Sequence, residues 1–77
     1  MEIEYREESR LQVWTIRVNG VFVGLLVLKT DNPWQPMYEV HQWDDARKGF
    51  TLYDTITGFI RPDNYQGLRL VVEAMVF

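Results

Sequence analysis

An Asn-Gly dipeptide, Asn19-Gly20, lies between two runs of apolar and β-branched residues and restricts the possible folds more than any other feature. A two-residue type I′ turn needs positive φ at both central positions, which Asn and Gly tolerate. Residues 11–29 are therefore predicted to form a β-hairpin at the centre of the domain. The register that this turn imposes gives three pairs on one apolar face: Val18 with Val21, Ile16 with Val23, and Trp14 with Leu25.

The rest of the chain predicts further strands. In residues 2–7 charged and apolar side chains alternate, as in an edge strand. Residues 37–43 also have the two-residue alternation of a strand, after a turn bounded by Pro33 and Pro36. Residues 51–60 combine helical spacing of apolar residues with β-branched content, so a short helix is predicted there and a strand is the alternative.

The C-terminal segment, residues 68–77, is predicted as a buried strand, with a C-terminal helix as the alternative. Gly24, inside the hairpin and facing Thr15, indicates a close backbone approach or a bend. The expected fold is mainly β (all-β or α+β). It is a small antiparallel sheet or half-barrel of about five strands built on the 11–29 hairpin, with at most one short helix near 51–60.

Length and composition exclude several classes of function. The 77 residues correspond to a single small domain, 1–77. A net charge of −3 with scattered basic residues argues against direct nucleic-acid binding and against a polybasic membrane patch. The longest apolar run has eight residues, too few for a membrane span, and the acidic start is unlike a signal peptide. The absence of cysteine excludes disulfides and thiolate sites and fits a cytoplasmic protein.

Catalytic residue patterns are missing. His41 is the only histidine, and its nearest carboxylates, Asp44 and Asp45, have no spacing typical of a metal site. No Ser or Thr lies in a recognisable nucleophile motif, and the glycines do not form a phosphate-binding loop. No catalytic residue, cofactor or metal is therefore expected, and the protein is not expected to be an enzyme.

Three aromatic residues, Trp34, Tyr38 and Trp43, lie within ten positions of one another. Trp and Tyr are enriched at the centres of protein interfaces, but they also cover the open ends of small sheets. The sequence leaves both interpretations open, and for Trp34 the choice is between core and interface. Two acidic pairs accompany them: Glu2 with Glu4, and Asp44 with Asp45.

These residues predict a small acidic protein-binding module that acts as an inhibitor or accessory subunit by occupying a surface on another protein. Trp34 and Trp43 would be anchors, and the carboxylates of Glu2, Glu4, Asp44 and Asp45 would steer the partner. The alternative is a binder of a small anionic ligand, a nucleotide or acyl-CoA. Such a ligand would lie at a homo-oligomer interface and be held by Arg47 and Lys48.

The segments "WTIRVNGVFVGLLVL", "YEVHQWDDARKGFTLYDTITGFI" and "LRLVVEAMV" follow one another in an order that resembles the core of GNAT-type acetyltransferases. The resemblance covers about half the chain. It implies a truncated acetyltransferase in which a loop around Gly49 and a helix after it hold the pyrophosphate of acetyl-CoA. The loop of that family carries two spaced glycines, of which this sequence keeps Gly49.

Overall fold

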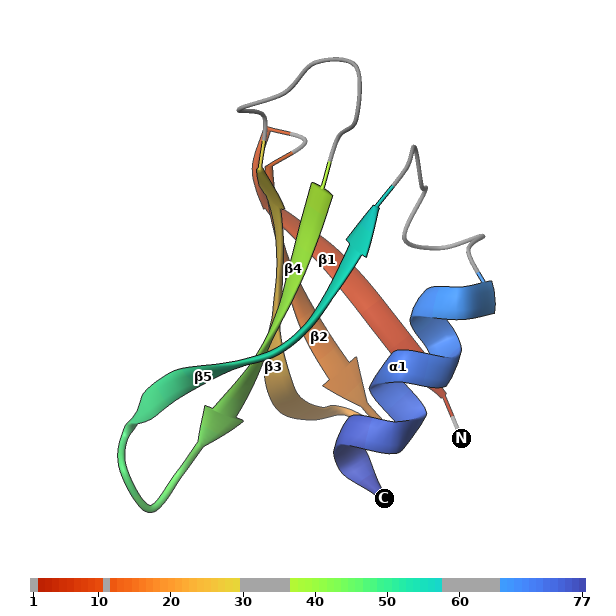
Figure 1. Ribbon diagram of the computed structural model, residues 1–77. Helices are drawn as coiled ribbons and strands as arrows, with labels where there is room; N and C mark the ends of the chain where they lie inside the picture. Colours follow the sequence, from red (N-terminus) through yellow and green to blue (C-terminus); the bar gives the residue numbers. More distant parts are fainter. Residues whose placement is uncertain (1, 11, 30–36, 58–65) are drawn as a thin grey trace.

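The computed structural model describes residues 2–10, 12–29, 37–57 and 66–77 and contains one antiparallel sheet and one helix (Figure 1). The sheet follows chain order, with each strand hydrogen-bonded to the next. The elements are β1 (Ile3–Ser9), β2 (Val13–Val18), β3 (Val21–Lys29), β4 (Met37–Asp44), β5 (Gly49–Thr57) and α1 (Gln66–Val76). The prediction of a mainly β fold built on about five antiparallel strands is confirmed.

The central hairpin has the turn that its Asn-Gly dipeptide predicts. Asn19 and Gly20 have φ values of 52° and 82°, so both occupy the left-handed region. The predicted pair nearest the turn, Val18 with Val21, is also present, and Arg17 lies opposite Phe22 as the same register requires. The turn is also joined to the residue before β1, because the Asn19 backbone N–H donates to the Glu2 carbonyl at 2.8 Å.

Beyond Arg17 the predicted register is wrong, because a bulge interrupts the β2–β3 ladder. Ile16 lies opposite Gly24 instead of Val23, and Trp14 lies opposite Leu26 instead of Leu25. A bulge places an extra residue on one strand, so every later pair moves by one position.

Gly24 lies next to the bulge and against the neighbouring strand β4. A Cβ at this position would collide with the His41 carbonyl oxygen of β4. The backbones of β3 and β4 therefore approach closely here, as expected for a glycine inside a strand.

A single hydrophobic core lies between the sheet and α1. Its sheet side includes Trp14 and Tyr38, whose ring centroids are 6.1 Å apart. The helix contributes three buried residues spaced by four and three positions, which is the period of one helical face. The buried core residues are Trp14, Ile16, Val18, Leu26, Tyr38, Val40, Ile56, Leu68, Val72 and Met75.

The predicted positions of the helix and the last strand are wrong. Residues 51–57 belong to strand β5, while 58–60 lie outside the described residues. The C-terminal segment, predicted as a strand, is helix α1. Residues 51–57 form a strand, as their β-branched content favours, and not a helix, as the spacing of their apolar residues favours. The strand is formed because β4 offers an edge for pairing along the whole length of β5.

Tyr5 of β1 lies beneath α1 with its hydroxyl buried and without a hydrogen-bond partner among the described residues. Burial raises the pKa of Tyr5 to about 12, and the charge of Glu73 acts in the same direction, while Arg69 opposes it. An unsatisfied buried hydroxyl costs free energy that a purely apolar ring would not.

Replacing Tyr5 with Phe is therefore expected to stabilise the fold by about 1 kcal/mol at neutral pH, or roughly 5 °C in Tm. The pKa of Tyr5 is higher in the folded state than in the unfolded chain, so the ionisation of Tyr5 does not lower the free energy of unfolding below about pH 10. As the pH rises from there through about 12, the unfolded chain ionises first and the wild-type protein loses stability. Urea unfolding at pH 7 and pH 11 should show the advantage of Tyr5→Phe widening at the higher pH. A loss of stability in the variant would show that the hydroxyl makes a favourable contact.

Candidate functional site

The face of the sheet opposite α1 is not covered by any described element, and aromatic side chains gather at one end of it. Phe22 of β3, Trp43 of β4 and Phe50 of β5 form three mutual ring contacts. The centroid distances are 6.2 Å for Phe22–Trp43, 6.1 Å for Phe22–Phe50 and 5.0 Å for Trp43–Phe50. We call these three residues the aromatic patch. Their strands are adjacent in the sheet, so the patch runs across three neighbouring strands.

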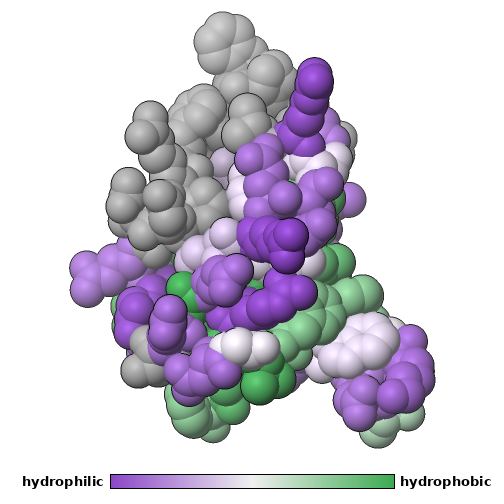
Figure 2. Space-filling model, turned by 180° about the vertical axis from the view of Figure 1, so that it is seen from behind, coloured by the Kyte–Doolittle hydropathy of each residue, from purple (hydrophilic) through white to green (hydrophobic). Residues whose placement is uncertain are grey.

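The surroundings of the aromatic patch are both apolar and charged. On β5, Phe50, Leu52 and Tyr53 are 45%, 50% and 42% exposed. On β2, the Arg17 guanidinium lies 5.9 Å from the centroid of the Phe22 ring, within the range of a cation–π interaction. Figure 2 shows the molecule from behind, where green and white side chains gather at the lower end and purple ones lie above them among the coloured atoms.

The two edges of the sheet differ in charge. Strand β1 carries four charged residues out of seven: Glu4, Arg6, Glu7 and Glu8. Strand β5 carries only Asp54 among nine residues, and the Asp54 carboxylate accepts the neighbouring Thr55 backbone N–H at 2.7 Å. Charged side chains protect an edge strand from pairing with other chains. The edge beside the aromatic patch is the less protected of the two.

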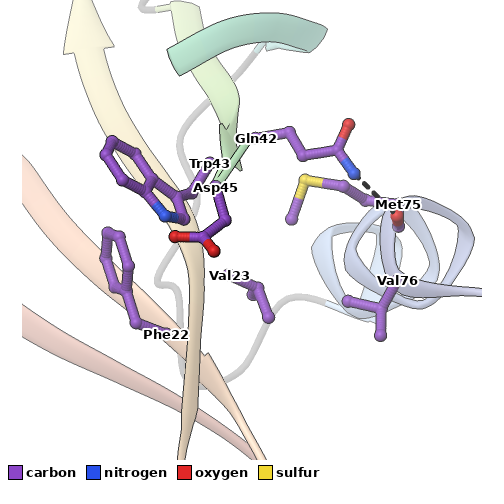
Figure 3. Close-up of a pocket in the computed structure, with 7 residues that line it drawn as sticks. All are labelled: Phe22, Val23, Gln42, Trp43, Asp45, Met75 and Val76. Atoms are coloured by element: carbon purple, nitrogen blue, oxygen red, sulfur yellow. Dashed lines mark hydrogen bonds between the residues drawn. The ribbon is translucent and has the colours of Figure 1, made fainter. Parts of the chain in front are cut away.

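A pocket of about 280 Å³ opens where β3 begins and β4 ends, beside the last turn of α1 (Figure 3). The Gln42 side-chain amide donates to the Met75 carbonyl at 3.2 Å and so ties β4 to the end of the helix. The pocket is lined by Phe22, Val23, Gln42, Trp43, Asp45, Met75 and Val76. Two of these residues, Phe22 and Trp43, also belong to the aromatic patch, so the pocket and the patch adjoin.

The three predicted aromatic binding residues have different positions. Trp43 lies in the aromatic patch and lines the pocket. Tyr38 is only 6% exposed and packs against Trp14 in the core, which corrects the expectation that it presents its ring to a partner. Its place in β4 explains the difference, because successive residues of a strand point to opposite faces and Trp43 lies an odd number of positions away. Trp34 lies outside the described residues, so its role as anchor stays a prediction.

The Asp44–Asp45 pair lies in the turn between β4 and β5 and is engaged within that turn. The Asp44 carboxylate accepts the backbone N–H groups of Ala46 and Arg47 at 3.0 and 3.2 Å. It also pairs with the Arg47 guanidinium at 3.6 Å, and Asp45 pairs with the Lys48 ammonium at 2.9 Å. Lys48 has a φ of 54°, which this tight turn requires. Asp44 therefore stabilises the turn, while Asp45 forms one exposed ion pair.

Glu2 and Glu4 are exposed at the opposite edge of the sheet from β5. The Glu2 backbone N–H donates to the Asn19 side-chain oxygen at 3.0 Å. The two predicted acidic pairs therefore belong to different parts of the molecule, and only the Asp44–Asp45 pair adjoins the pocket.

His41 lies on the open face, where its Nε2 is 3.1 Å from the Glu39 carboxylate. The Lys29 ammonium lies 3.6 Å from the same carboxylate, so Glu39 contacts both Lys29 and His41. Within residues 2–10, 12–29, 37–57 and 66–77, no three His, Asp or Glu side chains come together as metal ligands would. Gly49, which the acetyltransferase resemblance places before a helix, begins strand β5 instead.

Sequence reasoning missed Phe50, Leu52 and Met75 as candidate site residues. The sequence predicts a helix for residues 51–60, which include Leu52 and follow Phe50 directly. It predicts a strand for residues 68–77, which include Met75. The pairing of Phe22 with Arg17 could be predicted from the hairpin, but its contact with Trp43 depends on the neighbouring strand.

None of the helical residues that the structure describes forms a segment with the length and apolar character of a membrane span. Comparisons with protein-family models, with curated proteins and with solved structures find no significant match to this chain.

Proposed function

We propose that the protein is a small binding module that occupies a surface on another protein, as an inhibitor or accessory subunit does. The observation that carries this proposal is the aromatic patch, Phe22, Trp43 and Phe50, on a sheet face that no described element covers. Clustered aromatic residues beside exposed apolar neighbours are typical of the centres of interfaces.

The charge around the patch indicates the chemistry of the partner. The chain has a net charge of −3, Asp45 lies in the turn before the strand that carries Phe50, and Arg17 lies beside the Phe22 ring. Complementary charge at the rim of an interface accelerates association and orients the partner. The surface that fits is therefore apolar at its centre with a basic residue opposite Asp45, and the acidic, cysteine-free sequence fits a cytoplasmic partner.

The alternative of an anionic ligand receives less support. It depends on Arg47 and Lys48, and both side chains form ion pairs with carboxylates of their own turn. A nucleotide or acyl-CoA held by Arg47 and Lys48 would meet the carboxylates of Asp44 and Asp45. The aromatic patch presents no such repulsion to an apolar protein surface.

The double variant Phe50→Ser/Leu52→Ser is expected to weaken partner binding by about 2 kcal/mol or more, roughly 30-fold in Kd. Both side chains are about half exposed, so their loss should change the free energy of unfolding by only about 1 kcal/mol. The partner is first captured from the native host with the wild-type protein, then purified, and its Kd is measured by calorimetry.

Leu70→Ser is the matched control for this measurement. Leu70 is an exposed large hydrophobic residue on α1, away from the open face. The Leu70→Ser variant should bind the partner with the same Kd as the wild type. Equal losses of affinity in Leu70→Ser and in the double variant would indicate non-specific hydrophobic capture and contradict the proposal, as would full affinity in the double variant.

A further inference from the structure

We propose that the pocket beside the aromatic patch receives a positively charged side chain of the partner, a lysine or methylated lysine, whose ammonium group lies against Trp43 and Phe22 and beside Asp45. The proposal rests on the proposed function, because it assigns a role to one site within the partner interface. It is carried by the composition of the pocket, two aromatic rings and one carboxylate around about 280 Å³.

The aromatic rings supply the first part of the site. Phe22 and Trp43 both line the pocket, with ring centroids 6.2 Å apart and an interplanar angle of 54°. The negative face of an aromatic ring attracts an alkylammonium ion, and Trp is the most favourable ring for this contact. The pocket is also lined by the apolar Val23, Met75 and Val76, which suit the methylene groups of a lysine side chain.

The Asp45 carboxylate supplies the second part. Figure 3 shows it turned toward the side of the pocket on which Phe22 and Trp43 lie. This carboxylate already accepts an ammonium group, because the Lys48 side chain binds it at 2.9 Å. Both members of that pair are largely exposed, so the pair is weak and a partner ammonium can replace Lys48 at little cost.

A cation of the protein already lies near the aromatic patch. The Arg17 guanidinium lies 5.9 Å from the Phe22 centroid, and Arg17 does not line the pocket. The pocket is therefore a separate position from that of the Arg17 guanidinium. Its volume exceeds what the end of a lysine side chain fills, which leaves room for methyl groups on the nitrogen.

The test uses small probes and nuclear magnetic resonance titrations that follow the Trp43 indole N–H. The charged probes are N-acetyl-lysine methylamide and its trimethylated form, and the neutral control is the tert-butyl analogue of the trimethylated probe. Trimethylated and neutral probes have nearly the same shape, so their difference isolates the charge. We expect the trimethylated probe to bind about twofold to fivefold more tightly than its neutral analogue.

Two variants test the carboxylate in opposite directions. Asp45→Asn should weaken the charged probes about twofold to fivefold without affecting the neutral one. Lys48→Gln removes the competing ammonium and should strengthen the charged probes by a similar factor. Both positions are exposed, so far-ultraviolet circular dichroism of the two variants should match the wild type.

Equal binding of the charged and neutral probes would overturn the proposal, and so would unchanged binding in Asp45→Asn. A titration with choline separates a side-chain site from a site for a free cation. Choline binding more tightly than the trimethylated lysine probe would assign the pocket to a small metabolite and overturn the partner assignment. The broader proposed function is tested separately by the partner affinity of the Phe50→Ser/Leu52→Ser variant, because neither residue lines the pocket.

Discussion

Replacing Leu68 with Ala is expected to lower the free energy of unfolding by about 3 kcal/mol, while Leu70→Ala should change it by less than about 0.5 kcal/mol. Leu68 is fully buried in the core, and Leu70, two residues later in α1, is 62% exposed. Deleting buried methyl groups removes their transfer free energy and leaves a cavity that the structure fills only partly. For a domain of this size, a loss of 3 kcal/mol is a large share of the total stability.

This pair of variants also distinguishes the helix from the strand that the sequence predicts for residues 68–77. Residues two positions apart lie on the same face of a strand but on different faces of a helix. A strand would give the two leucines similar burial and similar effects. Urea unfolding of both variants under identical conditions provides the measurement. Comparable losses for Leu68→Ala and Leu70→Ala would contradict the arrangement of α1 on the sheet.

Gly24→Ala is expected to destabilise the protein by about 3 kcal/mol or to prevent folding, although the change adds only one methyl group. The added Cβ would collide with the His41 carbonyl oxygen, which belongs to the backbone of the neighbouring strand. A side chain could rotate away from such a clash, but a strand in the middle of a sheet can move only by breaking its hydrogen bonds.

Gly49→Ala is the control for this prediction. Gly49 begins β5, and a Cβ there would meet no atom of the described residues within 4 Å. It should therefore be neutral or slightly stabilising, because alanine restricts the unfolded chain more than glycine does. Thermal unfolding followed by circular dichroism compares the two variants. If Gly24→Ala melts within about 2 °C of the wild type, the close approach of β3 and β4 is not a constraint on the fold.

The aromatic patch and the pocket combine parts of the chain whose roles the sequence could not connect. Phe22, Trp43 and Phe50 come from three strands, and Met75 and Val76 come from the helix. Of these five residues, sequence reasoning selected only Trp43 as a binding residue. Its neighbours become visible as a site only when the strand order and the position of α1 are known.

The sequence by itself determined the hairpin turn, because Asn19-Gly20 meets a local requirement for positive φ that few dipeptides satisfy. It also determined the buried face of β2, since Trp14, Ile16 and Val18 alternate with more exposed residues. Both features depend on residues close together in the chain. Local chemistry is therefore enough to predict them.

The tertiary structure decided the register beyond the bulge, the strand at Gly49–Thr57, the helix at Gln66–Val76 and the burial of Tyr38. Short apolar segments suit either a strand or a helix, and the choice depends on the surface that each one can cover. Here β4 offered an edge to β5, and the Trp14 face of the sheet required an apolar helix stripe to cover it. Those surfaces exist only after distant parts of the chain have come together.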